Sequence, residues 1–115
     1  MITLDQVRSF VAVAEELHFG RAAERLRMTQ PPLSRQIQKL EKSVGARLLE
    51  RDNRRVELTG AGVAFLDEAY RLLNLVEGAG DLARRVDAGL LERAAVPLTR
   101  VVAEPLEHPF MRRGT

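Results

Sequence analysis

Residues 28–45 constrain the fold of this 115-residue chain more than any other segment. Thr29 is a hydroxyl residue of the kind that caps helices. Two consecutive prolines follow in the expected first turn, where a missing N–H breaks no helical hydrogen bond. Apolar residues then recur at spacings of four, three and four, namely Leu33, Ile37, Leu40 and Val44, and Gly45 is a candidate left-handed cap. The segment predicts a short amphipathic helix.

The opposite face of this helix is polar and has no carboxylate near its leading end. It carries Gln30, Ser34, Arg35, Gln38 and Lys42, side chains of the types that bond base edges and phosphates. Residues 20–56 hold ten bases and four acids, although the net charge of the chain is only +2. A solvated basic surface would explain such a charge run by itself. Its coincidence with the helix favours an anionic polymer held by one face.

Two further helices are predicted before this one. Thr3 and Gln6 form a capping box for a helix over residues 4–17, with Leu17 facing inward, and residues 21–27 form a second, short helix. Two short helices joined by a tight turn, the second one basic, are typical of a helix-turn-helix.

A β-hairpin is predicted after the basic helix. Residues 47–51 and 54–58 contain brief strands on either side of an Asp52-Asn53 turn, with Arg54 and Arg55 at the tip. A two-stranded ribbon beside a helix-turn-helix is a wing. An arginine at its tip suits the minor groove of DNA, whose negative potential is strongest where the groove is narrow.

A long helix is predicted over residues 60–88, capped by Thr59. We expect its apolar band to exceed what a three-helix head can cover, so that the band pairs with a partner subunit. A membrane-surface face is the less favoured alternative, because the polar side is not rich in lysine or arginine up to residue 83. The predicted dimerisation residues are Leu66, Ala69, Leu73, Val76 and Ala83.

The expected fold is therefore mainly α: a winged helix-turn-helix of three helices plus a two-stranded wing, followed by a long linker and dimerisation helix. Residues 1–58 would form the head, residues 59–89 the linker helix and residues 90–115 a tail without sustained periodicity.

Several classes of protein are disfavoured. The chain has no cysteine, which excludes a disulfide scaffold and suits the cytoplasm, and it has no apolar run near the roughly 20 residues of a membrane span. His18 and His108 are its only histidines, and neither has the neighbours of a metal site. Without a nucleophile, phosphate loop or carboxylate pair in a catalytic pattern, we expect no enzymatic activity, no cofactor and no metal.

Six segments follow one another in an order and spacing that chance does not explain. They are Phe10-Val-Ala-Val-Ala-Glu15, Phe19-Gly-Arg-Ala-Ala-Glu-Arg-Leu26, Gln30-Pro-Pro-Leu-Ser-Arg-Gln-Ile37, Leu40-Glu-Lys-Ser-Val-Gly45, Leu48-Leu-Glu-Arg51 and Leu58-Thr-Gly-Ala-Gly62. Together they resemble the DNA-binding head of the LysR-type transcriptional regulators. The resemblance implies a dimer, paired through the linker helix, that binds an interrupted, dyad-symmetric operator in double-stranded DNA.

The resemblance also implies roles for single residues. Bases of the major groove would be contacted by Gln30, Pro31, Pro32, Ser34 and Arg35, and the minor groove by Arg54. Phosphates would be contacted by Thr29, Gln36, Lys39 and Arg51. Two alternatives stay open: Gln30 could instead bond an unpaired N–H of its own helix, and the two prolines could either shape the helix start or touch thymine methyl groups.

The chain departs from the family pattern in two places. Gly20 stands where the family usually has Ser or Thr; it could still occupy an N-cap, but without the hydroxyl. Residues 90–115 do not resemble the start of the family's ligand-sensing domain, so no small-molecule effector site is expected in this chain. An alternative function follows: a head-only interaction protein that forms mixed dimers with full-length regulators through the linker helix.

Overall fold

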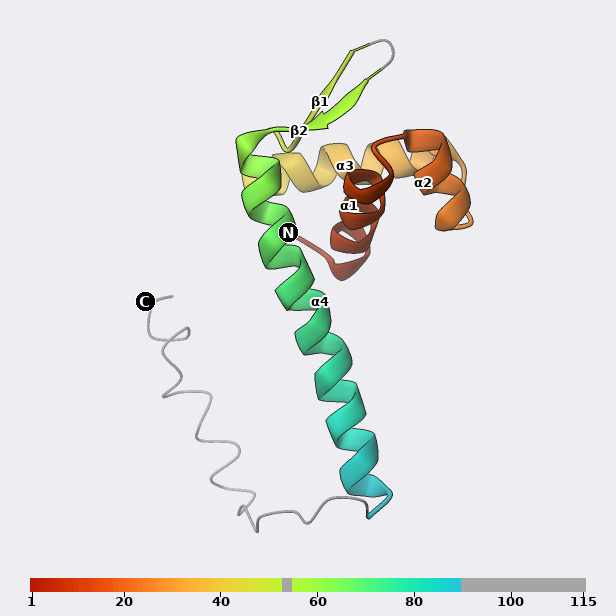
Figure 1. The fold of residues 1–115 in the computed structure, drawn as a ribbon, viewed down its shortest axis with the longest axis vertical. Helices are drawn as coiled ribbons and strands as arrows, with labels where there is room; N and C mark the ends of the chain where they lie inside the picture. The colour runs from red at the N-terminus through yellow and green to blue at the C-terminus, as the bar shows by residue number, and fades with distance from the viewer. Residues whose placement is uncertain (53–54, 90–115) are drawn as a thin grey trace. The chain divides into compact units, whose positions relative to one another are not determined.

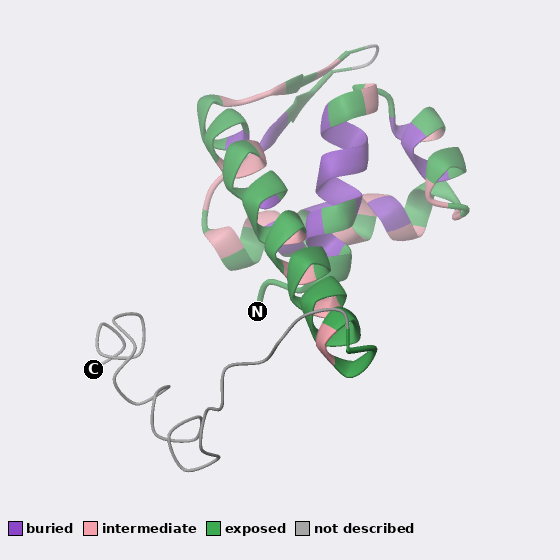
Figure 2. Ribbon diagram, turned by 60° about the horizontal axis from the view of Figure 1, so that its bottom comes forward, coloured by how far each residue is buried: buried purple, intermediate pink, exposed green. Residues whose placement is uncertain are grey.

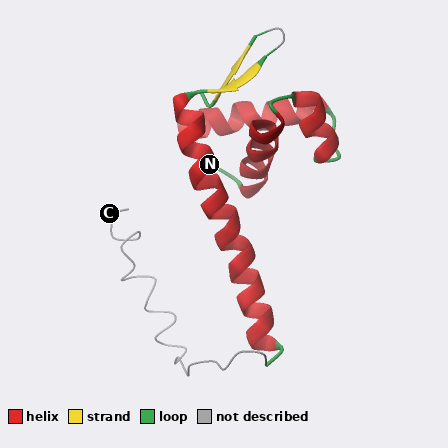
Figure 3. Ribbon diagram, in the orientation of Figure 1, coloured by secondary structure: helices red, strands yellow, loops and turns green. Residues whose placement is uncertain are grey.

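The structure is a computed structural model that describes residues 1–52 and 55–89. Figure 1 shows the order of the elements, and Figure 3 colours them by type. They are α1 (Leu4–Glu16), α2 (Phe19–Arg25), α3 (Gln30–Val44), β1 (Leu49–Arg51), β2 (Val56–Leu58) and α4 (Gly60–Asp87). The chain divides into two units, Met1–Gly80 and a second that begins at Asp81. The predicted tail over residues 90–115 lies outside the described residues. The expected winged helix-turn-helix is confirmed.

Helix α1 begins as predicted and ends one residue early. The N–H of Gln6 donates to Thr3 Oγ1 at 3.1 Å and the N–H of Thr3 donates to Gln6 Oε1 at 3.1 Å, which completes the capping box. Leu17 adopts a left-handed backbone with φ of 49° and is 45% exposed. The expectation that Leu17 faces inward is wrong, because this backbone turns the residue out of the helical path.

Helix α2 begins two residues before the predicted start. His18 is its N-cap and accepts a hydrogen bond at Nδ1 from the N–H of Arg21 at 2.9 Å. Gly20 lies inside the helix, so the suggestion that it could serve as an N-cap is wrong. His18, which the sequence analysis considered only as a metal ligand, therefore sets the start of α2.

The hydrophobic core lies among α1, α2 and α3, which pack against one another in the head (Figure 2). Helix α4 reaches this core near its N-terminal end, where the rings of Phe65 and Phe10 meet edge to face with centroids 5.4 Å apart. The largest fully buried side chains are Phe10, Leu33, Ile37, Leu40, Leu48, Val7 and Val13.

The start of α4 is fixed by a cap and by a close backbone approach. Thr59 Oγ1 accepts a hydrogen bond from the N–H of Gly62 at 2.9 Å, as expected of a cap, and donates to the carbonyl of Arg47 at 2.6 Å. A Cβ at Gly62 would lie 2.0 Å from the carbonyl oxygen of Leu48. Only glycine allows α4 to pass the chain at this distance.

Part of the apolar band of α4 packs on its own head. Ala69 is 2% exposed and forms a cluster with Val7 and Val11 of α1, against which Leu66 and Leu73 are partly buried. Residues of α1 therefore cover the apolar band at Ala69.

A polar cluster also joins α4 to α1 and α2. The hydroxyl of Tyr70 donates to Glu15 Oε2, and Arg25 Nη2 lies 2.6 Å from Glu15 Oε1. The hydrogen bond from Tyr70, followed by that from Arg25, lowers the pKa of Glu15. The hydrogen bond between Tyr70 and Glu15 also raises the pKa of Tyr70.

Candidate nucleic-acid interface

Helix α3 has one face buried in the head and one face that retains access to solvent. Leu33, Ile37 and Leu40 are 0%, 2% and 0% exposed and hold the helix in the core. The predicted contact residues on and just before α3 all retain access to solvent. Thr29, Gln30, Pro31, Arg35 and Lys39 are exposed, whereas Pro32, Ser34 and Gln36 are half-buried. Helix α3 and its N-cap residue Thr29 thus carry eight of the ten predicted DNA contacts.

The start of α3 differs from the expected cap. Thr29 occupies the N-cap position, yet its hydroxyl makes no capping hydrogen bond. A capping oxygen accepts from the second or third helical N–H. Here those positions are Pro31 and Pro32, which have no N–H. The prediction of a capping hydroxyl is therefore wrong, and the exposed hydroxyl of Thr29 is left to other partners.

Glu41 is the one acidic residue of α3, and its carboxylate bonds the backbone of the segment that follows the helix. Its Oε2 accepts hydrogen bonds from the backbone N–H groups of Leu48 and Leu49 at 2.8 and 3.2 Å. The carboxylate thereby anchors the start of the wing to α3. Sequence reasoning missed this role. The only available signal was a lone acid on a basic helix, followed closely by a strand.

Arg51 and Ser34, predicted to contact phosphate and base respectively, lie in direct contact. Arg51 Nη2 donates a hydrogen bond to Ser34 Oγ. The guanidinium carbon of Arg51 also lies 3.7 Å from the centroid of the Phe19 ring, a cation–π contact that fixes its position. Strand β1 is thus joined through one side chain to α2 and α3.

Gln36 is engaged inside the head. Its Oε1 accepts a hydrogen bond from the hydroxyl of Ser9, which is 4% exposed on α1. The side-chain carbonyl therefore has a structural partner, and the amide nitrogen is the end of Gln36 that remains for a phosphate. The role of Gln36 in contacting DNA stays a prediction.

The wing is a two-stranded antiparallel sheet in which Leu49 pairs with Leu58 and Arg51 with Val56. The strands are shorter than predicted. Asp52, expected in the turn, instead donates its N–H to the carbonyl of Arg55 at 3.1 Å. Arg54, the predicted minor-groove residue, lies outside the described residues, as does Asn53.

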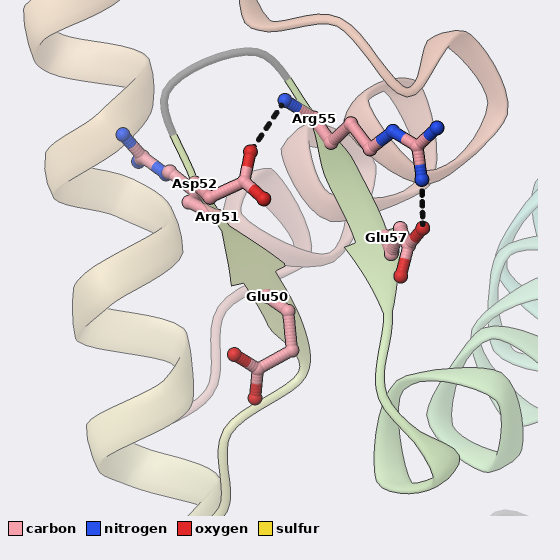
Figure 4. Close-up of a pocket in the computed structure, with 5 residues that line it drawn as sticks. All are labelled: Glu50, Arg51, Asp52, Arg55 and Glu57. Carbon is pink, nitrogen blue, oxygen red and sulfur yellow. Dashed lines mark hydrogen bonds and ion pairs between the residues drawn. The ribbon is translucent and has the colours of Figure 1, made fainter.

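Figure 4 shows a pocket on the wing, lined by Glu50, Arg51, Asp52, Arg55 and Glu57. The carboxylate of Asp52 accepts from the N–H of Arg55 at 3.1 Å, and Arg55 Nη1 lies 3.7 Å from Glu57 Oε1. The side chain of Arg55 is thus held along the wing by an exposed ion pair, an interaction worth at most about 1 kcal/mol.

Residues 1–52 and 55–89 hold no group of three or more histidine, cysteine or acidic residues that could bind a metal ion. None of the described helices is long and apolar enough to cross a membrane.

Helix α4 presents large apolar residues that the head does not cover. Val63, Leu72, Leu75 and Leu82 are 56%, 39%, 71% and 54% exposed. None of these four belongs to the predicted dimerisation set. The head covers Ala69 of that set, Leu66, Leu73 and Val76 are half-buried, and Ala83 is exposed.

Comparison with known protein families gives one clear match. Residues 4–63 match the family described as bacterial regulatory helix-turn-helix protein, lysR family. Among curated relatives, the uncharacterized HTH-type transcriptional regulator YnfL of Escherichia coli K12 is 50% identical over an alignment of 111 residues that covers 91% of this chain. That match spans only 37% of the length of YnfL.

Solved structures give the same fold. The DNA-binding domain of CbnR in complex with DNA superposes with a TM-score of 0.73 at 45% identity, covering 75% of this chain and 99% of that one. The DNA-binding domain of BenM in complex with benA site 1 DNA gives a TM-score of 0.73 at 44% identity, covering 76% and 99%.

Proposed function

The chain belongs to the LysR family of bacterial helix-turn-helix regulatory proteins, and we propose that it binds double-stranded DNA sequence-specifically as a dimer. The observation that carries the proposal is that α3 buries the apolar residues Leu33, Ile37 and Leu40 in the head, while cationic and amide side chains of the same helix are exposed. The DNA complexes of CbnR and BenM support it over the alternative of a pure interaction protein. The proposed setting is transcription regulation in the cytoplasm, without a catalytic step.

The proposed contacts divide by chemistry. We propose that Arg35 bonds a guanine edge with its guanidinium and that Gln30 bonds an adenine edge. The rest of the proposed base-facing surface consists of Pro31, Pro32 and Ser34. The proposed phosphate contacts are Lys39, Thr29, Gln36 and Arg51. Arg54 would contact the minor groove. Phosphate contacts would supply much of the affinity, because each one releases a condensed counterion.

Selection of bound sequences from a random duplex pool, at two salt concentrations, tests the proposal. We expect one enriched motif with two related half-sites, and an affinity that falls steeply as salt rises. Recovery of sequences without any shared motif would contradict sequence-specific binding.

The proposed dimer forms through α4. We place Leu72 and Leu75 at its centre because they are exposed and three positions apart, as on one helical face. Leu66, Leu73, Val76 and Ala83 stay proposed contacts at its margins. Ala69 would support the interface from inside the head.

Leu75→Lys tests this interface without touching the core, since Leu75 is 71% exposed. We expect sedimentation analysis to give a dimer for the wild type and a monomer for the variant, because the lysine would place a charge in an apolar seam. Asn74→Lys adds the same charge at the adjacent exposed position and should leave the dimer intact. A dimeric Leu75→Lys protein would contradict the assignment.

A further inference from the structure

The contact between Arg51 and Ser34 bears on what the proposed DNA-reading surface can recognise. A serine hydroxyl has one hydrogen to donate and two lone pairs with which to accept. A guanidinium can only donate. Since Arg51 Nη2 donates to Ser34 Oγ, it occupies a lone pair of the hydroxyl and leaves the hydroxyl hydrogen for another partner.

Arg51 is held in position to do this. Its guanidinium lies 3.7 Å over the ring of Phe19, which is itself 9% exposed at the first position of α2. Strand β1 supplies Arg51, and the pairing of Arg51 with Val56 fixes that strand in the wing. Three elements therefore determine the direction from which Ser34 receives its hydrogen bond.

We infer that Arg51 is a specificity-determining positioning residue, which acts through Ser34 and makes that hydroxyl a hydrogen-bond donor toward DNA. Ser34 then selects a base that presents an acceptor at that place in the major groove, such as guanine O6 or N7 or thymine O4. It disfavours one that presents an amino group, such as cytosine N4 or adenine N6. Donation by Arg51 also polarises the hydroxyl and strengthens its outward hydrogen bond.

This inference rests on the proposed function, in which the exposed face of α3 meets the bases. Under this inference, a residue of the wing changes the base preference of α3 without touching a base itself. The other N–H groups of Arg51 can still donate to a DNA phosphate. Arg51 can therefore contact the DNA backbone and position Ser34 at the same time.

Base preferences measured for four versions of the 115-residue chain test it: wild type, Arg51→Met, Ser34→Ala and the double variant. We expect Arg51→Met to lose about two- to tenfold of discrimination at a single base position, the worth of one hydrogen bond, and to accept amino-bearing bases there. Ser34→Ala should lose discrimination at the same position. The double variant should match Ser34→Ala, because Arg51 acts through the hydroxyl.

Arg55→Met is the matched control, because it removes one positive charge from the same wing. It should weaken binding to all sequences without changing the preference at the position read by Ser34. Uniform weakening by Arg51→Met, with an unchanged base profile, would overturn the inference and leave Arg51 as a phosphate contact. A wild type without any base preference would instead overturn the proposed function.

Thermal melting of each variant shows whether loss of Arg51 unfolds the wing. Should Arg51→Met melt well below the wild type, Arg51→Lys is the second variant, since lysine also only donates. It should keep the wild-type base at that position with weaker discrimination. A folded Arg51→Lys protein with no preference there would contradict the inference.

Discussion

Helices α3 and α4 share the three-and-four spacing of apolar residues but use it in opposite ways. In α3 three of the four residues of the apolar stripe, Leu33, Ile37 and Leu40, are buried in the head, and Val44 is half-buried. In α4 only Gly62 and Ala69 are buried, and Leu75 is 71% exposed. One helix therefore offers polar groups to solvent, and the other offers apolar ones.

This difference shows that an amphipathic sequence pattern predicts an apolar and a polar face on a helix. It does not predict whether the rest of the fold covers the apolar face. Because the head packs on the apolar face of α3, a substitution on that face should lower the stability of the fold. A substitution on the polar face should instead change the binding of DNA. For α4 the expectation is reversed beyond Ala69: its exposed apolar residues should affect assembly more than stability.

Leu40→Ala should produce the largest effect of this comparison. Removal of a fully buried leucine side chain should lower the free energy of unfolding by about 2–5 kcal/mol, measured by urea denaturation. Leu75→Ala on α4 is the control and should change the unfolding free energy by less than about 0.5 kcal/mol in the monomer. Equal losses for the two variants would remove the distinction between the helices.

Two glycines of α4 should respond in opposite directions. Gly62→Ala should destabilise the protein by about 1–3 kcal/mol, because the new Cβ would lie 2.0 Å from the backbone oxygen of Leu48. Gly78→Ala meets no atom within 4 Å and should stabilise the helix by up to about 1 kcal/mol. Thermal melting followed by circular dichroism measures both, and a stable Gly62→Ala protein would refute the close approach.

Tyr70→Phe should have the smallest effect and should depend on pH. Since the folded pKa of Glu15 lies below its ordinary value near 4.5, the stabilisation by this cluster is present above that pH and is lost as the pH falls through the folded pKa. The variant lacks the hydroxyl that is the main cause of the shift. Its melting temperature should therefore decline less than that of the wild type between neutral and acidic pH, and parallel declines would argue against the cluster.

The sequence predicted the features that depend on local periodicity and capping. The buried stripe of α3, the capping box of Thr3 and Gln6, and the left-handed cap at Gly45, with φ of 82°, all follow from neighbouring residues. The order of the elements and the wing follow in the same way. The residues of α3 that we propose to face the bases retain access to solvent, as the apolar spacing of the helix predicts.

Features that depend on contacts between distant segments were not predicted. The cover of Ala69 by Val7 and Val11 requires knowing how α1 and α4 cross, and no spacing within either helix carries that information. The anchoring of Leu48 by Glu41 is likewise a tertiary contact. The missing capping hydrogen bond of Thr29 could have been predicted from the sequence. The two positions whose N–H groups would donate to the hydroxyl are prolines, which have no N–H.

The central claim is that the exposed face of α3 distinguishes bases, and one comparison of binding free energies tests it most directly. Affinities for the selected operator and for a scrambled duplex are measured with wild type, Arg35→Ala and Lys39→Ala. Arg35→Ala should reduce the preference for the operator by about 1–3 kcal/mol, whereas Lys39→Ala should weaken binding to both duplexes alike. An Arg35→Ala protein with the wild-type preference would contradict the claim.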